Sequence, residues 1–244
     1  MSKNKSEFRN GFGETIFRQK YALNPEQTWG GKCYDIIYDV TQGNMGSGGA
    51  ELQNIMEKFK FLPGGRYIYY AGRQASYYNN CYLLKGEEDS REEWGNLVKR
   101  SSDCLMSGGG IGADYSVFRP SGSPLGRTGG VASGPLPLMN SVNEVGRNVM
   151  QGGSRRSAIY ASLNWQHGDA GEFLLCKNWS DMEIHSGFSY SDAKAANFNF
   201  PAPLDMTNIS LNYDNAFLRQ IQQGVLPETF VKNCRQALTT GDPG

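Results

Sequence analysis

The chain has 244 residues, and its 24 basic and 24 acidic side chains give a formal net charge of zero, which argues against a nucleic-acid polymer as the main partner. No apolar run approaches the ~20 residues of a membrane span, and the N-terminus lacks the apolar core of a signal peptide. Five cysteines without a Cys-x-x-Cys pair do not form a disulfide scaffold, and two distant histidines argue against a histidine metal site, so we expect a cytoplasmic protein without a metal.

Two domains are predicted, an N-terminal helical region over residues 1–60 and a second domain over residues 61–244. In the first, apolar residues recur at helical spacing over 29–40 and again over 52–59. A glycine-rich break at 43–49 separates these two stripes. The first domain is therefore expected to contain at least two amphipathic helices.

Beyond residue 60, short apolar runs alternate with amphipathic helices, which is typical of βαβ units and a parallel sheet. The candidate strands lie at 80–84, 111–118, 158–165 and 198–201. Helix starts are predicted near Ser90, Pro135, Asp169, Asp214 and Pro227. The second domain is therefore expected to be an α/β fold.

Three local features complete this expectation. Ser90-Arg91-Glu92-Glu93 predicts a capping box at a helix start. Residues 177–196 are polar and are predicted to be a loop. Residues 240–244 form a helix-ending turn where a parallel sheet would add its next strand. We therefore expect an incomplete sheet or barrel that something else finishes.

Glycines gather in one part of the chain, because twelve of the 31 lie between Gly108 and Gly153. Glycine adopts positive φ and lets backbone amides approach a ligand closely. Loops rich in glycine with arginines among them suit nucleotide phosphates. The pattern predicts a protein that binds nucleotides through its backbone.

Cys81 differs from the other four cysteines in its surroundings. It lies in a candidate strand directly after Asn79 and Asn80, and polar neighbours suggest that this strand end faces a cavity. The alternative is a small buried hydrophobic residue, which is common for a free cysteine. The other four cysteines fall on apolar helical faces and are predicted to be structural.

Four further residues stand near the ends of the first two strands. Asp89 and Ser90 follow the Cys81 strand, where they either cap a helix or contact a ribose hydroxyl. Arg119 and Arg127 follow the second strand and are either solvated or paired with a phosphate. The glycine-rich loop beside them favours the phosphate reading.

Arg155 and Arg156 lie in a second glycine-rich run, between Gly153 and Ser157. A guanidinium plane in such a loop can stack on a base or clamp a phosphate. No Walker A or Gly-x-Gly-x-x-Gly context is present, so neither glycine run is decisive alone.

Taken together, these residues resemble the catalytic subunit of ribonucleotide reductase, and specifically its adenosylcobalamin-dependent class II. The resemblance covers roughly residues 55–244, with its motifs in the family's order and at about its spacing. The matching runs are FLPGGR (61–66), NNCYLL (79–84), EDS (88–90), GGGIGADYSVFRPSG (108–122), GRTGGVASGP (126–135) and QGGSRRSA (151–158).

The resemblance implies a ten-stranded α/β barrel made of two five-stranded parallel halves. This chain would supply the helical N-terminal region and about four strands of the first half. Cys81 would be one of two cysteines that reduce the ribose and end as a disulfide. Asn80 and the Gly64-Gly65 turn would line the substrate site, and Arg155 or Arg156 would touch the substrate base.

The resemblance also implies an allosteric site that binds a deoxynucleoside triphosphate effector. Asp89, Ser90, Arg119 and the loop over 121–130, which contains Arg127, would form it. Effector sites of this family commonly lie at a dimer contact, so a homodimer is possible. A thioredoxin- or glutaredoxin-like protein would supply reducing equivalents, and the complete enzyme would use adenosylcobalamin.

The chain departs from the family in lacking the Asn-Pro-Cys-Gly-Glu motif that carries the radical cysteine, and it lacks the second redox cysteine. We therefore expect the first half of a catalytic subunit whose partner is a separate C-terminal half. A split gene is the preferred explanation, and a truncated or intein-derived fragment is the competing one.

Three alternatives stay open at this point. A class I subunit would receive its radical from a separate metal-bearing protein. A non-catalytic remnant would keep only the nucleotide-binding effector site. A generic α/β nucleotide enzyme would carry these motifs by chance.

Overall fold

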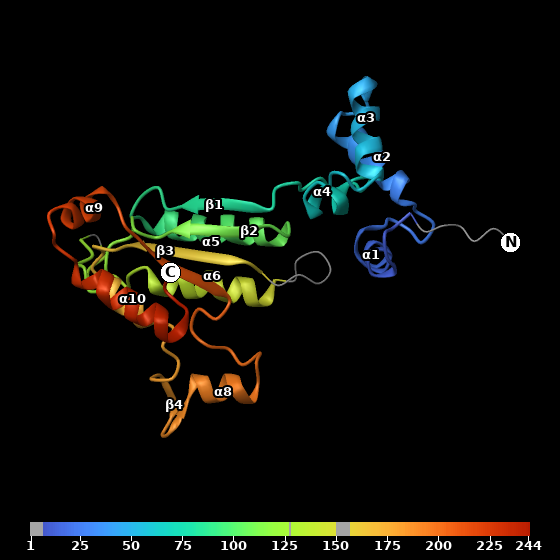
Figure 1. Ribbon diagram of the computed structural model, residues 1–244. Coiled ribbons are helices and arrows are strands. Elements are labelled where there is room, and N and C mark those ends of the chain that lie inside the picture. The colour runs from blue at the N-terminus through green and yellow to red at the C-terminus, as the bar shows by residue number, and fades with distance from the viewer. Residues whose placement is uncertain (1–6, 127, 150–156) are drawn as a thin grey trace. The chain divides into compact units, whose positions relative to one another are not determined.

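The computed structural model describes residues 7–126, 128–149 and 157–244, and the chain divides into two compact units, residues 1–80 and 81–244 (Figure 1). The division lies beyond the predicted one at residue 60. Residues just before it are tied to the helical unit, because Lys32 Nζ donates to Ala71 O at 2.8 Å and Gly72 N donates to Asp39 Oδ2 at 2.8 Å.

The first unit is helical, as predicted. Its elements are α1 (Gly11–Ile16), the π-helix η1 (Phe17–Tyr21), α2 (Trp29–Val40), α3 (Gly46–Glu57) and α4 (Gly65–Tyr70). Thr28 caps α2 by accepting a hydrogen bond from Gly31 N at 3.0 Å. An apolar core forms around Trp29. The Trp29 ring stacks on Phe59, with 5.0 Å between the ring centroids. The unit is thus held together by its own core.

The second unit contains a four-stranded sheet in the order β1 (Cys81–Lys85), β2 (Gly110–Asp114), β3 (Ile159–Asn164) and β6 (Thr207–Asn212). All three pairings are parallel (Figure 1). The α/β class with a parallel sheet is confirmed. β1 and β6 form the two edges, so the barrel is not closed within the described residues.

Two predictions between β3 and β6 are wrong. The fourth strand is β6 and does not lie at 198–201. Along β6 buried residues alternate with more exposed polar residues, so one side of this strand packs on the core. The segment 177–196 also has regular structure, namely β4 (Glu183–His185), β5 (Phe188–Ser189) and α8 (Tyr190–Ala196). Ser189 and Asp192 form a capping box that starts α8.

The remaining helices of the second unit are α5 (Arg91–Met106), α6 (Leu136–Asn148), α7 (Ala170–Leu175), α9 (Asn215–Gln222) and α10 (Glu228–Thr240). Their starts agree with the predicted ones, and Asp214 caps α9 through Ala216 N and Phe217 N. None of the helices within the described residues combines the length and the apolar character of a membrane span.

The capping box predicted for α5 forms only in part. Ser90 Oγ accepts from Glu93 N at 3.0 Å, as a cap should. Glu93 does not return the bond, because its carboxylate accepts from Glu87 N at 3.1 Å and pairs with Arg100. The glutamate therefore fastens the turn between β1 and α5 instead of closing the box.

The two faces of the sheet differ in character. Every second residue of each strand is covered on the side of the helices, and Ile111, Ala161 and Ile209 are buried in the core there. The alternate residues face the other way, among them Cys81 and Asn208, and both are exposed. Within the described part of residues 81–244, the sheet therefore has one packed face and one open face.

Gly244 continues the sheet beside β6. Its N–H donates to Ile209 O at 2.9 Å, and its carbonyl accepts from Leu211 N at 3.3 Å, which is the bonding pattern of a parallel strand. Lys177 Nζ holds the preceding turn through Asp242 Oδ2 at 2.5 Å. Gly244 thus forms with the free edge of β6 the hydrogen bonds that a neighbouring parallel strand would form.

Asp205 anchors the segment between β5 and β6 onto α6. Its side chain is only 2% exposed and accepts from Arg147, from Asn143 and from Lys194 on α8. Burial alone would raise the pKa of Asp205, but these hydrogen bonds outweigh burial and lower the pKa from 3.8 to about 2.

Replacing Asp205 by asparagine is expected to lower the free energy of unfolding at pH 7 by about 2 kcal/mol. The contribution of a carboxylate with a lowered pKa is present above about pH 4 and is lost as the pH falls towards 2. Urea unfolding at several pH values therefore should show this acid-dependent loss in the wild type and its absence in the variant. Asp103→Asn, in an exposed pair with Lys99, is the matched control and should change stability by less than about 0.5 kcal/mol.

Candidate functional site

Cys81 is the first residue of the edge strand β1, and its thiol is exposed. Because Tyr82 and Leu84 pack on the core, the alternation of the strand places Cys81 on the open face. The alternative of a small buried residue is thus wrong for Cys81. Its redox role stays a prediction.

The other cysteines are less uniform than predicted. Cys33 is buried in α2, and burial raises the pKa of its thiol to about 12. Cys104 and Cys176 are half-buried. Cys234 on α10 is exposed, so the prediction of a packed structural residue is wrong there, because α10 buries the neighbouring Asn233 instead.

The open face is mostly polar near the carboxyl ends of the strands. Asn212 Nδ2 donates to Ser162 Oγ at 2.9 Å. Asp114 accepts from Ser116 Oγ at 2.5 Å, and Ser116 Oγ accepts from Asn164 N at 2.8 Å. Sequence reasoning missed this network. The signal for it was the alternation of polar residues in β3 and β6.

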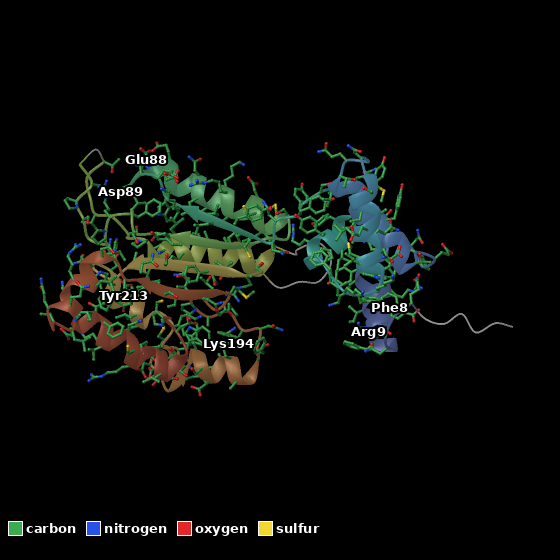
Figure 2. All side chains as sticks on the ribbon, turned by 45° about the horizontal axis from the view of Figure 1, so that its top comes forward. Phe8, Arg9, Glu88, Asp89, Lys194 and Tyr213 are labelled. Carbon is green, nitrogen blue, oxygen red and sulfur yellow. The ribbon has the colours of Figure 1, made fainter. Side chains whose placement is uncertain are left out.

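Asp89 and Arg119, predicted for the effector site, lie together. Asp89, which Figure 2 labels, accepts from Arg119 Nε at Oδ2 at 2.5 Å, and Arg119 Nη1 donates to Pro124 O at 3.3 Å. Both side chains are partly exposed. Ser90 beside them uses its hydroxyl as the helix cap. Arg127 lies outside the described residues.

The loop after β2 forms a narrow hairpin. Gly122 N donates to Ala132 O at 2.9 Å, and Leu125 N donates to Gly130 O at 3.0 Å. Arg119 reaches this hairpin through the carbonyl of Pro124, as described above. The arrangement holds a glycine-rich backbone next to one carboxylate and one guanidinium, which are groups that can bind a ribose and a phosphate.

Two residues after β3 brace this loop, and sequence reasoning missed both. Asp169 makes no capping bond at the start of α7, and both of its oxygens instead accept from Ser121 N at 3.0 Å. His167 Nδ1 accepts from Asp169 N at 3.0 Å, so Nε2 carries the proton and donates to Phe118 O at 2.7 Å. The sequence predicts only a helix start at Asp169, because the partner of its side chain is distant in the sequence.

The predicted substrate residues fall in different parts of the chain. Gly64 precedes α4, and a Cβ added there would lie 3.4 Å from Asn80 Nδ2, so the structure brings these two residues together. Gly65 is the first residue of α4. Arg155 and Arg156 lie outside the described residues, so the substrate site as a whole stays a prediction. Among the residues that are described, no three His, Cys, Asp or Glu side chains converge as a metal site.

Comparison with known proteins identifies relatives along most of the chain. A Vitamin B12-dependent ribonucleoside-diphosphate reductase of Thermoplasma acidophilum is 33% identical over 139 residues, which is 57% of this chain and 18% of that protein. One of the same description from Mycobacterium tuberculosis is 25% identical over 259 aligned positions, which is 94% of this chain and 34% of that protein. The chain thus spans between about a fifth and a third of the length of these relatives.

A solved structure and a family model agree with these relatives. The Actinobacillus ureae class Id ribonucleotide reductase alpha subunit superposes with a TM-score of 0.72 at 16% identity, covering 98% of this chain and 41% of that one, which shows a shared fold. The family model described as "Ribonucleotide reductase, barrel domain" matches residues 79–236. Because this match covers more than half of the chain, the chain belongs to the ribonucleotide reductase family, within the barrel domain of its large subunit.

Proposed function

We propose that this chain is the N-terminal part of a ribonucleotide reductase that converts ribonucleotides to deoxyribonucleotides by thiyl-radical chemistry. The observation that carries the proposal is the exposed thiol of Cys81 on the open face of a parallel sheet that belongs to this family. The relatives named as Vitamin B12-dependent reductases support it.

In this proposal Cys81 and a second thiol from the rest of the enzyme supply two electrons. The ribose 2′-hydroxyl leaves as water and a hydrogen takes its place, while the two thiols become one disulfide. A thioredoxin- or glutaredoxin-like dithiol then reduces that disulfide by exchange. The position of Cys81 on a strand suits this role, because a strand holds a donor group more precisely than a loop does.

The radical cysteine and the second redox cysteine are proposed to lie on a separate C-terminal half. Nothing in the sequence matches the Asn-Pro-Cys-Gly-Glu motif expected for the radical cysteine. The edge of β6, where Gly244 already makes strand-like hydrogen bonds, is the place at which we propose that the partner adds its strands. A homodimer and a cytoplasmic location belong to the same proposal.

Adenosylcobalamin is the cofactor proposed for the complete enzyme, in which it would supply the radical. The histidines of this chain do not suit a cobalt ligand, because His167 uses both ring nitrogens within the loop scaffold and His185 packs on Phe188. We assign no residue of this chain to the cofactor. A requirement for cobalamin in the assembled enzyme would separate class II from the class I alternative.

The effector site is proposed to lie between Asp89, Arg119 and the hairpin after β2. A deoxynucleoside triphosphate would place its phosphates on the guanidinium and the glycine-rich backbone, and its ribose on the carboxylate. Asp89 Oδ1 has no partner among the described residues, so it can accept a hydroxyl. The bonds of Arg119 to Asp89 and Pro124 use two of the five guanidinium N–H donors, so the others can bind the phosphates.

Arg119→Ala is expected to weaken the binding of a deoxynucleoside triphosphate to this chain about tenfold or more, because a charge-assisted hydrogen bond contributes roughly 1.5–3 kcal/mol. Isothermal titration with each of the four triphosphates measures the change. Arg219→Ala, an exposed arginine on α9, is the matched control and should leave binding unchanged. Equal affinity in Arg119→Ala and the wild type would remove Arg119 from the site.

The direct test of the reductase itself is turnover by this chain together with a complementing C-terminal half. Effector binding without turnover in any such mixture would favour the non-catalytic remnant instead. The two measurements therefore separate the catalytic proposal from the regulatory one.

A further inference from the structure

The turn between β3 and α7 lies directly against the loop after β2. A Cβ added at Gly168 would lie 2.7 Å from Pro120 Cβ, so the backbone of the turn meets the proline with no space for a side chain. On either side of this contact, His167 and Asp169 make the hydrogen bonds that hold the loop. We call His167 and Asp169 the brace pair.

His167 makes both of its ring hydrogen bonds only while the ring is neutral. Its Nδ1 accepts from Asp169 N at 3.0 Å, and a ring nitrogen that accepts from an N–H carries no proton. Its Nε2 lies 2.7 Å from Phe118 O, which can only accept, so Nε2 carries the single proton of the ring. A second proton would therefore enter at Nδ1, directly opposite the N–H of Asp169.

The carboxylate of Asp169 is the group that such a proton would attract. It belongs to a buried residue, and both of its oxygens accept from Ser121 N at 3.0 Å. A neutral ring does not compete for these oxygens, because Nδ1 then has no hydrogen to donate. An imidazolium N–H carries positive charge, so its hydrogen bond to a carboxylate is stronger than that of a neutral amide. Protonation of His167 therefore sets the ring against Ser121 for the same carboxylate.

The other charged side chains around His167 are occupied or exposed. Among the described residues of the end of β2, the segment after it, α7 and the start of α9, they are Asp114, Arg119, Glu172 and Asp214. Three of them have hydrogen-bond partners of their own, and Glu172 is exposed. Asp169 is therefore the carboxylate that a proton on Nδ1 would meet.

The bond from Asp169 controls the base of the glycine-rich hairpin. Ser121 directly precedes Gly122, whose N–H donates to Ala132 O at 2.9 Å. Gly134 on the returning arm packs on the same bond, since a Cβ added there would lie 2.9 Å from Ser121 N and would overlap Asp169 Oδ2. Both arms of the hairpin thus rest on one carboxylate, and its loss from Ser121 would loosen them together.

We propose that the brace pair makes effector binding depend on pH, because protonation of His167 draws the Asp169 carboxylate away from Ser121 and loosens the hairpin. This inference rests on the proposed function and adds a means of regulation to the same effector site. His167 and Asp169 are positioning residues, which act on the effector through Ser121. Affinity is full on the alkaline side of the range in which histidine side chains titrate, and it falls on the acid side.

Isothermal titration of the chain with each of the four deoxynucleoside triphosphates, at about pH 8 and about pH 5.5, tests the inference. His167→Asn is the decisive variant, because an asparagine oxygen accepts from the N–H two residues further on and does not titrate. Protonation of the triphosphate itself affects both proteins equally. The fall in affinity between the two pH values should therefore be about tenfold larger in the wild type than in His167→Asn, which corresponds to one charge-assisted hydrogen bond.

Two further measurements make this result specific. His185, the other histidine of the chain, packs on Phe188, and His185→Asn should keep the pH profile of the wild type. The amide resonance of Ser121 in NMR spectra gives a readout without nucleotide. It should shift with the same midpoint as the ring of His167 in the wild type. This measurement needs no variant, so it tests the brace pair even where His167→Asn does not fold.

The outcomes separate this inference from the proposed function. If a triphosphate binds at pH 8 and the wild type and His167→Asn lose affinity equally on acidification, the inference is wrong while the effector site stands. If no triphosphate binds the wild type at either pH, the effector site falls, and the Ser121 resonance decides on the brace pair alone. A Ser121 amide that does not follow the titration of His167 would overturn the inference in either case.

Discussion

Replacing Cys81 by serine is expected to abolish multiple turnover in a reductase assembled from this chain and a C-terminal half, with a loss of about three orders of magnitude or more. A hydroxyl cannot form a disulfide with the second thiol, so the two electrons needed to replace the 2′-hydroxyl are not available. The measurement is the amount of deoxyribonucleotide formed per enzyme in the presence of a dithiol reductant. The exposed position of Cys81 means that the substitution should not disturb the fold.

Two controls make this result specific. Cys234→Ser removes the other exposed thiol of the chain and should leave turnover unchanged. The chain without its C-terminal half should show no turnover at all, because we propose that the radical cysteine lies on that other half. Full turnover by Cys81→Ser, or turnover by the isolated chain, would contradict the role proposed for Cys81.

Gly134→Ala is expected to disrupt the loop after β2 and to lower stability by roughly 3–5 kcal/mol. Gly134 has a φ of +74°, which costs a residue with a side chain about 1–2 kcal/mol. Its new Cβ would also overlap Asp169 Oδ2 and lie 2.9 Å from Ser121 N, which breaks the bond between them at a further cost of roughly 1.5–3 kcal/mol. Urea unfolding and effector titration measure the two consequences.

Two other glycines of the same loop separate the strain from the clash. Gly129 has a φ of +68° and open space around its Cβ position, so Gly129→Ala should show only the backbone strain. Gly126 has open space without a positive φ, so Gly126→Ala should be close to neutral. Equal effects of Gly134→Ala and Gly129→Ala would show that the brace from Asp169 does not hold the loop.

The elements that could be predicted are those whose signal is local. The starts of α9 and α10 follow from Asp214 and Pro227, and the first three strands follow from short apolar runs. β6 was missed because Asn208 and Ser210 interrupt its apolar residues, while Phe198 gave a misleading apolar signal. That interruption is itself informative, since it arises where one face of a strand does not pack.

Contacts between distant segments were harder to predict at the site. The sequence predicts both Asp89 and Arg119 as site residues, but their pairing depends on how β1 and β2 align. Asp169 gave a convincing helix-start signal while its side chain serves another loop altogether. The roles of Cys81, Asp89 and Arg119 stay predictions. So do those of Arg127, Arg155 and Arg156, which lie outside the described residues.

The hydrogen bonds of Gly244 have a consequence for any strand that is added along β6. They set Gly244 level with Ser210, on the same side of the sheet as the thiol of Cys81. Successive side chains of a strand face opposite sides of the sheet, so the position of Gly244 fixes the side on which each later residue of the strand would lie. Odd steps from Gly244 would turn towards the helices and even steps towards the open face. An added strand whose register along β6 is shifted by one residue would turn the opposite set of side chains to each face. The register of Gly244 therefore determines which residues of such a strand face the open side.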